Sequence, residues 1–115
     1  MTAAEAVARF PGAVFLVGLF DPVAAVHARV VERTARPGCP LVILLADPPA
    51  PLLPSRSRAE LVAALARVDA VVLPGPDGAP AGLDLAPEGA LVREEMADLD
   101  RRRALMLHVH RRHSG

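Results

Sequence analysis

The stretch AVFLVGLFDP, residues 13–22, decides the fold. It opens with an unbroken apolar run that ends at Gly18, and such a run is typical of a strand buried on both faces. Asp21 and Pro22 follow, a pair that favours a helix start with the aspartate as N-cap and the proline in the first turn. The stretch therefore predicts a buried strand that leads directly into a helix.

The same alternation continues along the chain. Apolar runs predict further strands at 41–46 and 70–73 and a short one at 90–93, where a helix from Glu88 onward is the competing assignment. A capping box at Ser57 and Glu60 predicts another helix start. Helices are expected over 2–9, 22–36, 58–67 and 97–112.

Strands that alternate with helices predict an α/β fold. We expect a Rossmann-like, three-layer α/β/α arrangement with a small parallel sheet of four strands in the order 3-2-1-4, and a long C-terminal helix. The 115 residues suit a single domain over 1–115, with its core at 13–93 and the last helix at 97–112. A flavodoxin- or receiver-like domain is the main rival, but a receiver needs a lysine and the chain has none.

Composition argues against several classes of partner. Thirteen basic residues balance 13 acidic ones, and the aromatic residues are three Phe, so we expect no nucleic-acid partner. The apolar runs are too short to span a bilayer and no basic stretch precedes one at the N-terminus, so we expect a cytoplasmic protein without membrane contact. His108, His110 and His113 lack a cysteine or carboxylate to complete a site, so we expect no resident metal.

Residues 18–27, GLFDPVAAVH, resemble the G-x-F-D-x-x-H-x-G-H motif of the cytidylyltransferase-like nucleotidyltransferases. Residues 58–65 and 68–72 are similar to the family's R-A-E…A-L…V-D-x-V-V helix and strand. The similarity runs from about 13 to 93, and the nearest subgroup is the heptose-phosphate adenylyltransferase type. The resemblance implies transfer of a nucleotidyl group from CTP or ATP, with Mg²⁺, to a phosphorylated sugar or alcohol.

The resemblance also assigns site residues. It makes His27 the catalytic residue, and the nucleotide-binding positions are Gly18, Leu19, Phe20, Asp21, Ala24, Arg58 and Arg93. The motif is incomplete, because Ala24 stands where the family has its first histidine and Val26 where it has glycine. Loss of one transition-state donor costs about 2.7–4 kcal/mol. We therefore expect weak catalysis or none.

Other interpretations of these residues stay open. His27 could be a partly exposed helix histidine rather than a phosphate contact, and Asp21 could serve only as a helix cap. The last helix is apolar nearly all round, with Leu105, Met106, Leu107 and Val109. One side is expected to cover the sheet and another to meet a second copy. The alternative to an enzyme is therefore a non-catalytic module that binds a nucleotide or forms a homodimer.

Overall fold

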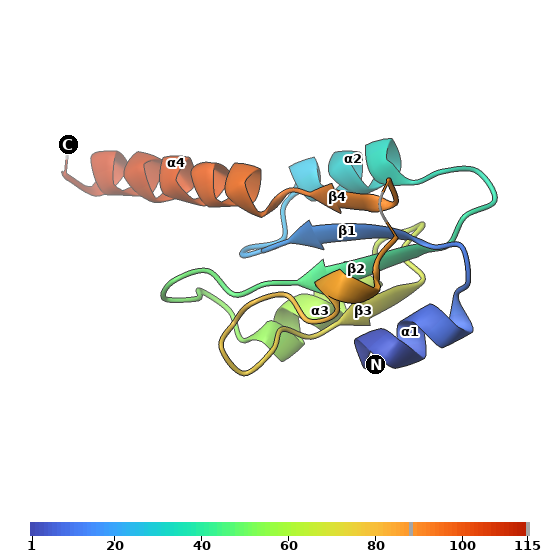
Figure 1. The fold of residues 1–115 in the computed structure, drawn as a ribbon. Helices are drawn as coiled ribbons and strands as arrows, with labels where there is room; N and C mark the ends of the chain where they lie inside the picture. The colour runs from blue at the N-terminus through green and yellow to red at the C-terminus, as the bar shows by residue number, and fades with distance from the viewer. Residues whose placement is uncertain (88, 115) are drawn as a thin grey trace.

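Four parallel strands form one sheet at the centre of the computed structural model (Figure 1). The structure describes residues 1–87 and 89–114, and within them the side chains up to residue 107. The strand order is β3-β2-β1-β4, which confirms the expected 3-2-1-4 arrangement of an α/β fold. The elements are α1 (Ala3–Arg9), β1 (Val14–Gly18), α2 (Ala25–Thr34), β2 (Leu41–Leu45), α3 (Ser55–Ala63), β3 (Ala70–Val72), the 3-10 turn η1 (Leu83–Leu85), β4 (Leu91–Arg93) and α4 (Glu95–Ser114).

The two central strands are buried along their whole length. Every residue of β1 and β2 is shielded from solvent, as their unbroken apolar runs predicted. They pair in parallel from Val14 opposite Leu41 to Gly18 opposite Leu45. The short strand β4 pairs with the other side of β1, so 90–93 is a strand and not the start of a helix. The competing assignment began at Glu88, which lies outside the described residues.

Helices cover both faces of the sheet. Val30 and Val31 of α2 and Val62 of α3 pack on one face, against the alternate residues of β1 and β2 that begin with Val14 and Leu41. Ala6 of α1 and the η1 segment cover the opposite face. The structure thus confirms the predicted three layers.

The last helix does not cover the sheet as expected. It starts directly after β4, and in Figure 1 it runs away from the carboxyl ends of the strands as a separate rod. From Arg103 to Leu107 every side chain is exposed. The molecule consequently measures 51 × 30 × 24 Å. Within the described part of the chain, no helix is both long and apolar enough to cross a bilayer.

Two predicted helix starts were wrong. The helix after β1 begins at Ala25 rather than Pro22, with Ala24 as N-cap, because the Asp21 carboxylate accepts hydrogen bonds elsewhere. The next helix begins at Ser55 with Pro54 as N-cap. The Pro54 carbonyl accepts from the N–H of Arg58, so the Ser57 that was expected to cap this helix lies inside its first turn.

Candidate functional site

The turn after β1 forms the centre of the candidate site. Phe20 is fully buried there and has a backbone φ of +49°, in the left-handed region that costs energy for an aromatic residue. The N–H groups of Leu19 and Phe20 both point to the carboxylate of Asp98, which comes from the first turns of α4. Successive backbone N–H groups that converge in this way form an anion-binding concavity. In this chain the anion is one of its own side chains.

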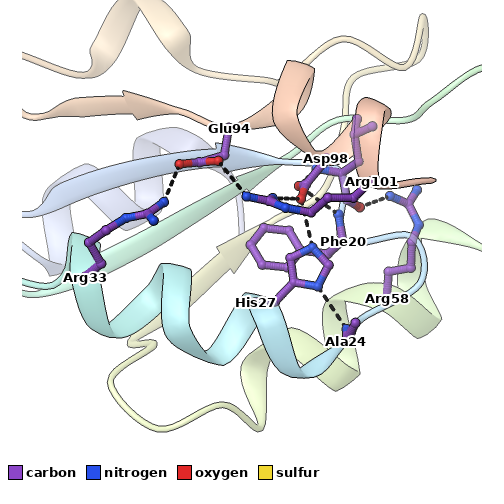
Figure 2. A network of polar contacts seen from close by, with 9 residues as sticks. Phe20, Ala24, His27, Arg33, Arg58, Glu94, Asp98 and Arg101 are labelled. Carbon is purple, nitrogen blue, oxygen red and sulfur yellow. Dashed lines mark hydrogen bonds and ion pairs between the residues drawn. The ribbon is translucent and has the colours of Figure 1, made fainter. Parts of the chain in front are cut away.

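Asp98 is surrounded by donors (Figure 2). Its Oδ2 accepts from the N–H of Leu19 at 2.9 Å and from that of Phe20 at 3.4 Å. Its Oδ1 lies 2.8 Å from Nε2 of His27 and accepts from Arg101 at 2.7 Å. Asp98 is only 5% exposed. The carboxylate therefore occupies the hydrogen-bond donors that lie at the end of β1.

His27 is locked between two partners. Its Nδ1 accepts from the N–H of Ala24 at 2.9 Å, so this nitrogen carries no proton. The proton of the neutral ring therefore lies on Nε2, which donates it to Asp98. His27 is 5% exposed and its ring packs on Phe20 at 4.8 Å between centroids. The interpretation of His27 as a partly exposed helix histidine is wrong, and both of its nitrogens are already occupied.

Gly18 has a packing reason to be glycine. A Cβ at this position would lie 2.6 Å from the ring of Phe20 and 2.9 Å from Oδ2 of Asp98. Both distances are shorter than real Cβ contacts. Gly18 thus makes room for the buried carboxylate, and no nucleotide is needed to explain it.

A second layer of charge surrounds this carboxylate. Arg101 donates to Asp98 and to Glu94, and Glu94 in turn accepts from Arg33 of α2 at 2.8 Å. Burial alone would raise the pKa of Asp98. The hydrogen bonds from His27, Leu19 and Arg101 outweigh burial and hold that pKa below its ordinary value. Asp98 is accordingly a stable anion inside the protein.

The lowered pKa of Asp98 predicts a loss of stability in acid. In the unfolded chain this carboxyl titrates at about 3.9. The folded-state pKa is lower, so the stabilising contribution of Asp98 is complete above the unfolded value and disappears as the pH falls through the folded one. Urea unfolding between pH 7 and pH 3 should therefore show a steeper acid loss for the wild-type chain than for Asp98→Asn. Equal slopes would contradict a depressed pKa.

Arg58 lies in the core and not in an open site. Its side chain is completely buried, and its guanidinium donates to the carbonyls of Leu19 at 2.7 Å and Ala46 at 3.1 Å. It also donates to the carbonyl of Leu53 at 3.1 Å and pairs with Asp47. These contacts hold together the chain after β1, the chain after β2 and the segment before α3. Arg58 has no donor left that solvent could reach.

Asp21 also holds loops together. Its carboxylate accepts from the N–H groups of Leu52 and Leu53 at 2.7 and 3.0 Å, which fixes the proline-rich segment before α3. Arg102 of α4 approaches the same carboxylate, with Nε 3.7 Å from Oδ2, and donates to the carbonyl of Ala50. Asp21 is thus buried and binds the loop. It does not cap α2, and it is not exposed to a ligand.

A small cavity lies beside this network, between the N-terminus of α2 and α4. It measures about 170 Å³, and its walls include Ala24, Val26, His27, Arg101 and Leu105. Pockets for drug-sized ligands usually measure about 300–1,000 Å³. Its acidic side chains, Asp21 and Asp98, already hold hydrogen-bond donors. A triphosphate with Mg²⁺ therefore does not fit the residues present here.

Arg93 lies apart from the other predicted residues. It ends β4 and lines a separate cleft of about 350 Å³ at the carboxyl ends of the strands, together with Leu19, Asp47 and Glu95. Its guanidinium binds both oxygens of Glu95, at 2.9 to 3.2 Å. The hydrogen bond and charge of Glu95 raise the pKa of Arg93 further. The structure thus gathers Gly18, Leu19, Phe20, Ala24 and His27 around Asp98 and places Arg93 elsewhere.

Asp98 could not be singled out from the sequence. An aspartate in the first turns of a helix is already favoured by the helix dipole, and Asp100 two residues later carries the same local signal. Among the described residues, no group of three or more His, Cys, Asp or Glu side chains could hold a metal ion. The side chains of His108, His110 and His113 lie outside the described part of the chain.

The fold and its site define a class: a small α/β domain with a parallel 3-2-1-4 sheet whose anion concavity is occupied by an internal aspartate. Comparison of the chain with models of protein families, with curated proteins and with solved structures gave no match.

Proposed function

We propose that this domain is a nucleotidyltransferase-like domain without nucleotidyl-transfer activity, and that it functions as a protein-interaction module. One observation carries the proposal: the carboxylate of Asp98 occupies the backbone donors of Leu19 and Phe20 at the end of β1. A carboxylate and a phosphate compete for the same kind of donor. The seat in which a nucleotide phosphate would bind is therefore filled by the protein itself.

The residues around this seat support the loss of catalysis. Phosphoryl-type transfer depends on positioned charge that neutralises the transition state. Ala24 has no side-chain donor, and the imidazole of His27 is held by Ala24 and Asp98. A phosphate that approached this imidazole would have to displace a buried carboxylate of like charge. These contacts favour a structural role for His27 over a catalytic one.

The same contacts give α4 its anchor. Asp98 and Arg102 fasten its first turns to the chain after β1 and to the loop at Ala50, while the helix beyond them projects from the domain. An isolated helical segment of this length is marginal in water, because most helical stability in proteins comes from packing. We infer that the turn after β1 now anchors α4 in place of a ligand, and that the projecting part of α4 contacts a partner.

Titration calorimetry with CTP and with ATP, each with Mg²⁺, tests the proposal. We expect no heat of binding up to millimolar nucleotide, for the wild-type chain and for Ala24→His/Val26→Gly alike, because neither substitution removes Asp98. Micromolar binding to the wild-type chain that weakens in His27→Ala would contradict the proposal and favour a working nucleotide site.

A second candidate function is the binding of a small phosphorylated ligand in the cleft at Arg93. The cleft lies at the carboxyl ends of the strands, where open α/β sheets bind ligands, and its 350 Å³ is within the usual range for pockets. The same titrations distinguish this candidate. Heat that persists in His27→Ala and disappears in Arg93→Ala would place the ligand in this cleft and not at the turn after β1.

A further inference from the structure

The outward face of α4 carries a self-complementary stripe. Met96, Asp100, Arg103 and Leu107 follow one another at spacings of four, three and four residues, so they share one side of the helix. This side lies opposite to Asp98 and Arg102, which point into the domain. Met96, at its start, also borders the cleft at Arg93. Met96 is 67% and Leu107 58% exposed, and the side chains of Asp100 and Arg103 are 74% and 66% exposed. We refer to these four residues as the outer stripe.

The geometry points to a second copy of this chain as the partner of the outer stripe, bound through an antiparallel pairing of the two α4 helices. This inference rests on the proposed interaction function and names its partner. In an antiparallel pair with a two-fold axis between Asp100 and Arg103, each Asp100 lies opposite Arg103 of the second copy. The same register places each Met96 opposite Leu107 of the second copy. A two-fold interface requires one patch to match itself, and the outer stripe does.

Other arrangements lose this match. A parallel pair in register would set Asp100 beside Asp100 and Arg103 beside Arg103, and like charges at helix contacts destabilise. The antiparallel arrangement also places the positive end of each helix dipole near the negative end of the other. Within one chain the two charged side chains are barely paired, at 4.0 Å, so they are available to a partner. Charge complementarity therefore selects both the partner and the orientation.

Further apolar surface lies beside the stripe. Leu105 and Met106 are 44% and 48% exposed and precede Leu107, so three consecutive side chains spread apolar surface over more than half of the helix circumference. Exposed apolar side chains that gather in one place mark an interaction surface. The crossing of two α4 helices would shield part of this surface in each copy.

Analytical ultracentrifugation of the full chain, from low to high micromolar concentration, tests the pairing with a charge swap. We expect the wild-type chain to move from 12.1 kDa towards twice that mass as its concentration rises. Asp100→Arg and Arg103→Asp should each weaken dimerisation at least tenfold, because each sets like charges opposite one another. The double variant Asp100→Arg/Arg103→Asp restores opposite charges and should recover the dimer. Arg56→Asp, an equal charge change at an exposed position of α3, is the matched control and should dimerise like the wild type.

Two outcomes would overturn the inference. One is a wild-type chain that stays monomeric throughout, and the other is a dimer that neither single swap weakens or that the double swap does not recover. Absence of the dimer would not contradict the proposed loss of nucleotide binding, because nucleotide titration tests that loss separately. Conversely, micromolar nucleotide binding that weakens in His27→Ala would refute the proposed function even if the dimer forms. All four side chains of the outer stripe are exposed, including the two that are substituted, so the variants are expected to fold.

Discussion

The Asp98→Ala variant is expected to unfold with a free energy about 3–5 kcal/mol lower than that of the wild-type chain. The substitution leaves the N–H groups of Leu19 and Phe20 and the Nε2–H of His27 without their acceptor, in a region where Asp98 is 5% exposed. Each buried donor that loses its partner costs about 1–3 kcal/mol. Arg101 can turn to solvent, so it adds little to the loss.

Urea unfolding at pH 7, at a low micromolar concentration where the chain is monomeric, measures this effect without a contribution from dimerisation. Asp100→Ala is then the matched control. Asp100 is the same residue type on the same helix, but its side chain is 74% exposed, so its removal should change the free energy by less than about 0.5 kcal/mol. If Asp98→Ala does not fold, Asp98→Asn keeps the size and one acceptor oxygen and should show a smaller loss. Equal stabilities of Asp98→Ala and Asp100→Ala would mean that the carboxylate does not hold this turn.

Inorganic phosphate adds a test of what Asp98 replaces. If its carboxylate stands where an external anion would bind, then Asp98→Ala should gain stability from millimolar phosphate, while the wild-type chain should not. Binding to the folded state alone raises stability in proportion to the logarithm of ligand concentration. Identical phosphate dependence of both chains would show that removal of the carboxylate does not reopen an anion seat.

The sheet could be predicted from sequence because its strands are buried on both faces. The unbroken apolar runs 13–18 and 41–46 became β1 and β2, and the Rossmann-like expectation of strand order was confirmed. Such runs depend little on what lies beside them, since either face of the strand meets apolar side chains. The apolar runs therefore located the central strands, and their alternation with helices was enough to predict the α/β fold.

The helix starts depended on contacts distant in sequence, and there local signals failed. Asp21 has the right type and position to cap a helix, yet its carboxylate binds backbone N–H groups at 52 and 53. His27 instead accepts the N–H of Ala24 and completes the start of α2. A capping preference is worth about 1 kcal/mol, which two hydrogen bonds to a loop can outweigh.

The centre of the site could not be predicted for a related reason. Asp98 lies 79 residues from Leu19, and nothing in its own surroundings separates it from Asp100. The resemblance pointed to the turn after β1 and assigned its residues to a nucleotide, an assignment that the nucleotide titrations test. What fills the turn is determined by α4, whose sequence has no counterpart in the motif. The contacts of Asp98 therefore depend on a segment that the motif does not include.

The Arg58→Ala variant is expected to lose about 3–5 kcal/mol of its free energy of unfolding, with loss of folding in the more severe case. Arg58 is completely buried, and the carbonyls of Leu19, Ala46 and Leu53 would each lose a donor. Asp47 is 31% exposed at its side chain, so water can partly compensate its lost partner. The removed side chain would also leave a gap between the loops after β1 and β2.

Arg56→Ala is the matched control, since Arg56 lies on the same helix and is exposed, and it should unfold like the wild type. Arg58→Lys separates charge from geometry: it keeps the positive charge but cannot reach three carbonyls with a planar group, so it should recover only part of the loss. A nucleotide contact would behave differently. If Arg58 contacted a nucleotide instead, Arg58→Ala would be about as stable as the wild type but would no longer bind CTP or ATP. That result would support the nucleotide-binding role that the resemblance implies for Arg58.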